Sequence, residues 1–144
     1  MSSVLIACHS FTGKTKSLAE AAAEGARSAG AEVQLSPVQD VSVEAVAAAD
    51  ALLLATPQTF GTPAGATKEL LERLWMGKDQ LQPGKGFASI VCHAHEPAGT
   101  SDLFAKLPGY FGFTAVGEPL LVSAEEIEDG RKRARELGAA LASR

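Results

Sequence analysis

Residues 4–15, Val4-Leu5-Ile6-Ala7-Cys8-His9-Ser10-Phe11-Thr12-Gly13-Lys14-Thr15, pass from an apolar run into small hydroxyl residues and a glycine. A stretch rich in Ala, Glu and Lys, typical of a helix, follows at once. A strand that turns into a helix in this way leaves the first N–H groups of the helix without partners, at the positive end of its dipole. The segment therefore predicts an anion site, and first of all a bound phosphate.

Three interpretations of this segment compete. Residues 8–15 miss the Walker A pattern G-x-x-x-x-G-K-[ST] because Cys8 stands where the first glycine belongs, and that glycine lets the loop wrap a pyrophosphate. The segment could also be a Ser or Thr cap before an ordinary helix. Residues 10–15 resemble, without a mismatch, the S-x-T-G-x-T phosphate loop of the flavodoxin family, which holds the 5′-phosphate of FMN. The complete match favours FMN.

The bulk composition limits the classes of function. The chain has 144 residues, of which 46% are hydrophobic and 21% charged, so we expect one domain with a proper core. A net charge of −4 argues against nucleic-acid binding. No apolar run reaches the ~18 residues that span a bilayer, and the N-terminus shows no secretion signal, so we expect a cytoplasmic protein without a membrane segment.

Apolar runs alternate with helical patterns along the whole chain. We expect five strands, at residues 4–8, 32–35, 51–55, 87–92 and 115–122. The helices are expected at residues 14–29, 66–75 and 100–111, the last interrupted near Pro108, with short turns at 43–49 and a final helix that begins with a Ser123/Glu126 capping box. This alternation predicts a parallel sheet covered on both faces. Ligands of such sheets bind beyond the carboxyl ends of the strands, here in the loops at 8–15, 56–64 and 92–100.

The second of these loops carries a further resemblance. Thr56-Pro57-Gln58-Thr59-Phe60-Gly61 is similar to a segment of the quinone reductases that resemble the Trp-repressor-binding protein, and nearly the whole chain resembles flavodoxin-fold FMN proteins. The resemblance implies a flavodoxin-like three-layer α/β sandwich whose five-stranded parallel sheet has the order 2-1-3-4-5. It also implies that this loop borders the flavin ring, with Phe60 beside it. Without the resemblance, Phe60 could equally fill the loop's own core, and the Pro and Gly residues could only mark turns.

The third loop departs from the family, because residues 92–100 contain no aromatic side chain other than histidine. His93, His95 and Glu96 could supply part of a metal site, but no further ligand is evident, so we expect no metal. We hold two hypotheses as equal: that His93 or His95 hydrogen-bonds the flavin, which would stabilise its anionic reduced form, and that both are solvated loop residues.

Cys8 and Cys92 lie at the ends of expected strands one and four. With strand three between them, they should be ~10 Å apart, too far for a disulfide, so we expect free core thiols. Trp75 lies in a segment that, in the reductases resembled, can place a tryptophan near the flavin of a neighbouring subunit. It could equally be a core or interface residue.

Taken with the resemblance, these features predict an FMN flavoprotein, most simply an oxidoreductase that uses NADH or NADPH to reduce quinones or similar acceptors. The alternatives are a flavodoxin that carries single electrons between redox proteins and a phosphate-binding module without activity. Partners would be a small-molecule acceptor or a redox protein, and a homo-oligomer is compatible with the resemblance. No side chain is expected to act as a catalyst, and the FMN contacts are expected from Ser10, Phe11, Thr12, Gly13, Lys14, Thr15, Thr56, Pro57, Gln58, Thr59, Phe60, Gly61, His93, His95 and Gly99.

Overall fold

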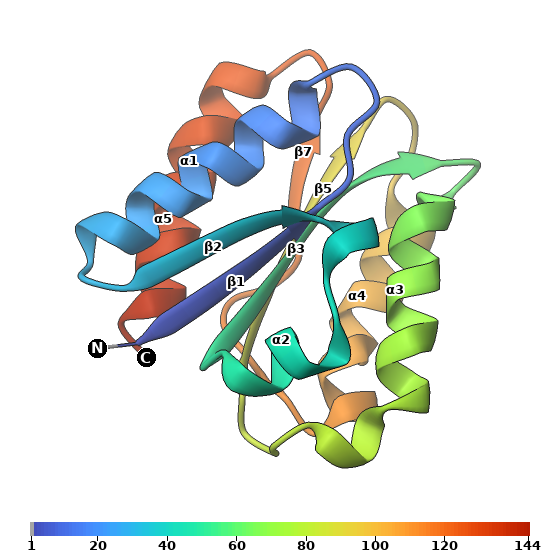
Figure 1. Cartoon of the computed structure of the whole chain (residues 1–144). Coiled ribbons are helices and arrows are strands. Elements are labelled where there is room, and N and C mark those ends of the chain that lie inside the picture. The colour runs from blue at the N-terminus through green and yellow to red at the C-terminus, as the bar shows by residue number, and fades with distance from the viewer. Residues whose placement is uncertain (1) are drawn as a thin grey trace.

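A computed structural model describes residues 2–144 and contains one twisted sheet flanked by helices (Figure 1). Five parallel positions follow the order β2-β1-β3-β5 and then β6 with β7, which confirms the predicted order 2-1-3-4-5. A short strand, β4, pairs antiparallel with the end of β3. The strands are β1 (Ser3–Cys8), β2 (Glu32–Pro37), β3 (Ala51–Thr59), β4 (Thr62–Pro63), β5 (Gly86–His93), β6 (Thr114–Ala115) and β7 (Leu120–Ser123).

Helices cover both faces of the sheet because the central strands are apolar on both sides. Along β1, Val4 and Ile6 pack into the core cluster under one layer of helices, whereas Leu5 and Ala7 pack into the cluster on the opposite face. The first layer consists of α1 (Lys14–Ser28) and α5 (Ile127–Ala142), and the second of α2 (Val43–Ala48), α3 (Gly65–Met76) and α4 (Ala98–Phe111) (Figure 1). Among residues 2–144, no helix combines the length and apolar character needed to cross a membrane.

The α1–α5 layer is packed almost backbone to backbone. A Cβ added to Gly138 of α5 would collide with the carbonyl oxygen of Ala22 in α1, and a Cβ added to Gly25 would collide with the carbonyl oxygen of Arg135. Such contact leaves α1 little freedom to shift or tilt, since close-packed interiors transmit small changes in volume. The start of α1 therefore occupies a defined position at the edge of the sheet.

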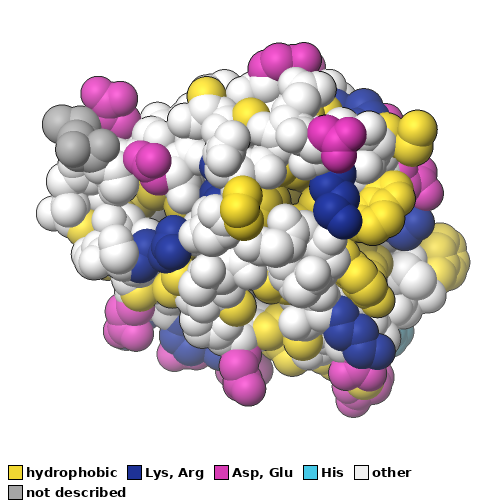
Figure 2. All heavy atoms as spheres, turned by 90° about the horizontal axis from the view of Figure 1, so that it is seen from below, with side chains coloured by type: hydrophobic (Ala, Val, Ile, Leu, Met, Phe, Trp, Pro, Cys, Tyr) yellow, Lys and Arg dark blue, Asp and Glu magenta, His cyan; other side chains and the backbone are white. Residues whose placement is uncertain are grey.

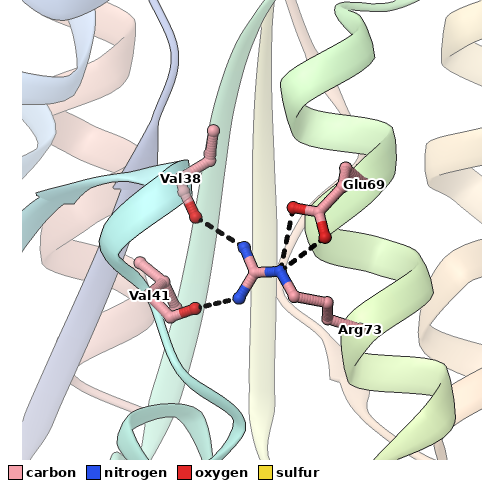
Figure 3. A network of polar contacts seen from close by, with 4 residues as sticks. All are labelled: Val38, Val41, Glu69 and Arg73. Carbon is pink, nitrogen blue, oxygen red and sulfur yellow. Dashed lines mark hydrogen bonds and ion pairs between the residues drawn. The ribbon is translucent and has the colours of Figure 1, made fainter.

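On the other face, Arg73 of α3 ties the helix to the chain that follows β2 (Figure 3). Its guanidinium donates to the carbonyl oxygens of Val38, at 2.9 Å, and Val41, which flank a short 3₁₀ turn, Val38–Asp40. Glu69, one helical turn earlier, holds the guanidinium nitrogen Nε at 2.8 Å. A charged donor on backbone carbonyls secures this connection where no strand pairing can do so.

Two expectations about the C-terminal part of the chain were wrong. The last strand is not continuous over 115–122: it divides into β6 and β7, because Gly117 adopts a φ of 72° and Pro119 has no N–H for a ladder. The capping box does not form either. Ser123 belongs to β7, its hydroxyl accepts from the N–H of Glu125, and α5 begins at Ile127 after Glu126.

Two further boundaries differ from expectation. The helix at 98–111 runs through Pro108 without a break, since Phe104, Leu107 and Phe111 anchor it in the core on both sides of the proline. β3 continues to Thr59 rather than ending at residue 55, because Thr56 and Pro57 still pair with β5, and Gln58 and Thr59 pair with β4.

Candidate functional site

Three segments meet at the edge where β1, β3 and β5 end (upper part of Figure 1). We call them the anion loop (residues 9–15), the hairpin (residues 56–63, where β3 turns into β4) and the histidine loop (residues 93–97). They are the three segments singled out from the sequence. The parallel order of the strands brings them to the same edge, although the last begins about eighty residues after the first.

The anion loop is shaped by its own residues. The N–H of Gly13 donates to Ser10 Oγ at 3.0 Å, and Gly13 takes a φ of 98°, a conformation that glycine adopts without strain. The N–H of Ser17 then starts the helical ladder by donating to the carbonyl oxygen of Gly13. The N–H groups of residues 14–16 belong to the first turn, where a helix offers no acceptor. They are donors for an anion, beside the exposed hydroxyl of Thr12.

The charges at the start of α1 also favour an anion. The first turn contains no acidic residue, and Lys14 and Lys16 are exposed there. Cations at the positive end of a helix dipole disfavour the helix by ~0.3–1 kcal/mol each. A bound anion removes this conflict, so the choice of residues makes physical sense for a loop that holds a phosphate.

The hairpin carries an exposed aromatic side chain on a residue whose backbone conformation is strained. Thr59 pairs with Thr62, and the two residues between them, Phe60 and Gly61, have φ values of 52° and 78°. Phe60 is the only residue other than glycine with a positive φ in the described chain, and its side chain is fully exposed at 103%. A ring that is fully exposed does not fill the loop's own core.

The hairpin and the histidine loop are joined by the side chain of Gln58. Its amide nitrogen Nε2 lies 3.0 Å from the carbonyl oxygen of Glu96 and 3.4 Å from that of His95. Its oxygen Oε1 accepts a hydrogen bond from Thr100 Oγ1 at 2.7 Å. Thr100 is buried in the first turn of α4 and was not among the expected site residues. Its hydroxyl, three residues after a Pro, offered no distinctive sequence signal.

A second contact holds the same two segments close together. A Cβ added to Gly99 would lie 2.8 Å from the carbonyl oxygen of Gly61, closer than side chains tolerate. Gly99 therefore allows the turn of the hairpin to approach the start of α4. This close approach explains why a glycine is needed at a position that the sequence analysis selected only for its place in the loop.

Two predicted site residues lie in the interior instead. Thr56 is fully buried, and its hydroxyl receives a hydrogen bond from Thr67 Oγ1 at 2.9 Å and one from the N–H of Ala64 at 3.3 Å, so it braces the hairpin from within. Thr15 is also buried, at 2% exposure, and hydrogen-bonds Cys92 of β5. Pro57 and Thr59 are half-buried in the hairpin, and Phe11 is exposed, with its ring edge-on to His9 at 4.7 Å.

The two cysteines are free and buried, as expected, on strands that flank β3. Burial raises the pKa of Cys8 to about 11, against a smaller opposing effect of Lys16. Burial likewise raises the pKa of Cys92, partly offset by the hydrogen bond from Thr15 and the charge of Lys14. Both thiols are protonated at neutral pH and are therefore poor nucleophiles.

The histidines lie at the site but do not gather ligands. His93 Nδ1 is 3.0 Å from the carbonyl oxygen of His95, so this nitrogen serves the loop's own conformation, while the ring of His95 is exposed. Glu96 accepts from the N–H of Ala98 at 3.1 Å and caps the start of α4. Within residues 2–144, no three His, Cys, Asp or Glu side chains lie close enough to hold a metal ion.

Two further features of the surface lie at different distances from the loops. A hollow of about 430 Å³ adjoins the anion loop on the side of β2, where Ser36 and Gln39 join His9 and Lys16. Trp75, in contrast, lies at the end of α3 that is remote from the loops. It is half exposed, edge-on to Phe111 at 6.0 Å, and Lys78 lies over its ring.

Among residues 2–144, the opposite edge of the sheet offers no comparable arrangement. Figure 2 looks onto this edge and shows acidic and basic side chains scattered over it, without a concentration of either sign. Lys85, which lines a hollow of about 480 Å³ there, is buried and donates to the carbonyl oxygens of Ala47 and Ala49 at the end of α2. Burial lowers the pKa of this lysine. Its charge serves the end of a helix and is not free for a ligand.

Comparisons with known proteins agree with this geometry. The sequence profile of the flavodoxin family matches residues 6–138. A protein named NAD(P)H dehydrogenase (quinone), from Cupriavidus metallidurans strain CH34, is 33% identical, and the match covers 83% of this chain and 72% of that protein.

Solved structures show the same fold over nearly the whole chain. A flavodoxin from Archaea superposes with a TM-score of 0.87 at 19% identity, covering 98% of this chain and 96% of that one. A flavodoxin, WrbA-like protein from Agrobacterium tumefaciens gives a TM-score of 0.80 at 24% identity, covering 99% and 96%. The flavodoxin of Megasphaera elsdenii gives 0.82 at 23% identity, covering 98% and 99%. The chain belongs to the flavodoxin family.

Proposed function

We propose that this flavodoxin-family chain binds one FMN without a covalent bond and uses NADH or NADPH to reduce quinones or similar acceptors. The observation that carries the proposal is the meeting of an anion loop and a strained, exposed aromatic residue at one edge of the sheet. FMN combines a phosphate with a flat apolar ring, so one ligand satisfies both features.

The anion loop would bind the phosphate of FMN. Backbone N–H groups at the start of α1, the hydroxyls of Ser10 and Thr12 and the charge of Lys14 suit a dianionic phosphate monoester. The buried Thr15 would support this loop from below. The match between these donors and a single phosphate favours FMN over a ligand with a longer phosphate chain.

The hairpin and the histidine loop would hold the ring. Phe60 offers an aromatic face, Gly61 and Gly99 let the backbone approach closely, and His95 offers an exposed imidazole nearby. FMN, when bound, supplies the redox chemistry, and the chain's residues bind the ring, orient it and exclude water from one side of it. No side chain is assigned a proton transfer.

The relative named NAD(P)H dehydrogenase (quinone) supports the choice of donor and acceptor, at 33% identity over most of both chains. A one-electron carrier is the second candidate function. It is favoured by the likeness in fold to flavodoxins over 98% of this chain and 96% or more of theirs. A cytoplasmic location and assembly into a homo-oligomer stay predictions.

An absorption spectrum of the purified protein, before and after addition of FMN, tests the cofactor. We expect flavin bands near ~375 and ~450 nm that remain with the protein after gel filtration. NADH and NADPH oxidation is then followed with and without benzoquinone. Turnover with benzoquinone supports the reductase. FMN binding without turnover, together with electron transfer to cytochrome c after chemical reduction, favours the carrier, and no FMN binding leaves only a phosphate-binding module.

A further inference from the structure

Backbone pairing between the two ring-facing segments stops just before the site. The last partners of the β3–β5 ladder are Pro57 and Cys92. Beyond them β3 turns away to pair with β4, while β5 ends at His93 beside β7. The hairpin and the histidine loop therefore leave the sheet without a ladder between them, and other contacts must set the distance between them.

Gln58, the first residue after the ladder, takes over this connection. Its side chain reaches residues 37, 38 and 42 positions later in the chain, at distances of 3.4, 3.0 and 2.7 Å. The amide nitrogen has two backbone carbonyl oxygens within hydrogen-bond distance, and the amide oxygen has a hydroxyl donor. A side chain engaged in this way has no free donor for a ligand, so a direct contact of its N–H groups with FMN would require these bonds to break.

We propose that Gln58 is a positioning residue, whose amide clasps the histidine loop and the start of α4 and so sets the width of the flavin cleft. The expected effect of Gln58 on FMN rests on the proposed function, whereas its hydrogen bonds to the histidine loop and α4 do not depend on it. Thr100 is the fixed end of the clasp because it is fully buried, and the carbonyl oxygens of His95 and Glu96 are the movable end. Without the amide, the carbonyl oxygen of Glu96 would turn to water and the loop would loosen, while that of His95 would keep its contact with His93 Nδ1.

Hydrogen exchange on the flavin-free protein tests the clasp without any cofactor. In Gln58→Ala, we expect the amides of residues 94–96, 98 and 99 to exchange at least about tenfold faster than in the wild type, with the exchange of the sheet unchanged. Gln34→Ala is the matched control, since Gln34 also donates from an amide, to Ser36 Oγ at 3.2 Å, but on β2 away from the hairpin. Equal exchange of the amides of residues 94–96, 98 and 99 in all three proteins would overturn the proposal.

FMN titration of Gln58→Glu distinguishes the loss of these hydrogen bonds from a general loss of structure. At pH 8 the carboxylate faces two carbonyl oxygens and cannot donate, so we expect about tenfold weaker FMN binding than in the wild type. At pH 5 the carbonyl oxygens favour the protonated acid, which can donate to one of them. The ratio of the variant's Kd to that of the wild type should therefore fall toward one as the pH is lowered, whereas the ratio for Gln58→Ala stays constant.

The two tests separate this inference from the proposed function. If the wild type takes up no FMN, the proposed function fails, and the exchange experiment still decides whether the clasp exists. If the wild type binds FMN but Gln58→Glu shows the same ratio as Gln58→Ala at every pH, the donor role of Gln58 is contradicted, while the FMN proposal stands.

Discussion

The anion loop and the pair formed by the hairpin and the histidine loop lie at the same edge of the sheet but are built differently. The anion loop is one contiguous segment, turned by the Ser10–Gly13 hydrogen bond and continued by α1. The ring-facing pair joins segments that are far apart in the chain, through the side chain of Gln58 and the close contact of Gly99 with Gly61. The first inherits its rigidity from the core, whereas the second depends on a few polar contacts.

This difference suggests a division of roles between affinity and redox tuning. A rigid, charged loop suits the phosphate, which is the same in every redox state of the cofactor. A loop pair that can adjust suits the ring, whose charge changes during reduction. Substitutions that loosen the core under α1 should therefore affect the whole protein, whereas those at the ring should affect binding and potential with little loss of fold.

Gly138→Ala should have the largest effect on stability, because it disturbs the α1–α5 packing that supports the anion loop. The added methyl group would collide with the carbonyl oxygen of Ala22 and force α5 away from α1. We expect a loss of ~3 kcal/mol in the free energy of unfolding, measured by urea denaturation. Gly109→Ala is the control: no atom lies within 4 Å of the added methyl, so this variant should be neutral or slightly more stable. Equal effects in the two variants would contradict the role given to α1–α5 packing.

Thr12→Val should weaken FMN binding by ~1–3 kcal/mol with little change in stability, because a charged acceptor loses a hydroxyl donor. Thr12 is exposed in the anion loop, so the substitution leaves the core untouched. Fluorescence titration of FMN gives the affinity, and Thr114→Val, on the exposed strand β6 at the other edge, serves as the matched control. An unchanged Kd would refute the placement of the phosphate.

Phe60→Gly should change stability and binding in opposite directions. Glycine adopts a φ of 52° without strain, so the flavin-free protein should gain ~1 kcal/mol in thermal or urea unfolding. Loss of the ring should at the same time raise the Kd for FMN and shift the flavin potential, measured by spectroelectrochemistry. Phe60→Ala, which keeps the strain, separates the two effects. If neither affinity nor potential moves, Phe60 does not contact the flavin.

Lys16→Gln should produce the smallest effects, a small gain in stability and a small loss of FMN affinity. Removing a cation from the first turn of α1 should stabilise the flavin-free protein by ~0.3–1 kcal/mol at low salt. The affinity for FMN should fall slightly and should depend less on ionic strength, since one attractive charge is gone. Titrations at two salt concentrations check this. A fall in stability instead would mean that Lys16 serves the fold and not the anion.

Short-range patterns were enough to predict the fold class. The alternation of apolar runs with helical segments predicted the parallel sheet, and the first helix ends at Ser28, one residue before its expected end. The strand order came from the resemblance to flavodoxin-fold proteins. The errors lie where tertiary contacts override a local signal. α4 continues through Pro108 because core packing on both sides of the proline holds the helix. Ser123 is part of β7, so the capping box could not form.

The sequence by itself determined the alternation of strands and helices and the anion loop, because each is a pattern of neighbouring residues. This alternation was enough to predict a parallel sheet and the edge that carries the site. Only the tertiary structure decided that Thr56 faces the interior, that Gly99 must be small and that Gln58 joins two distant segments. These features depend on where β3 and β5 part after their last paired residues. No short-range pattern encodes that point, since it results from how the whole sheet twists and packs.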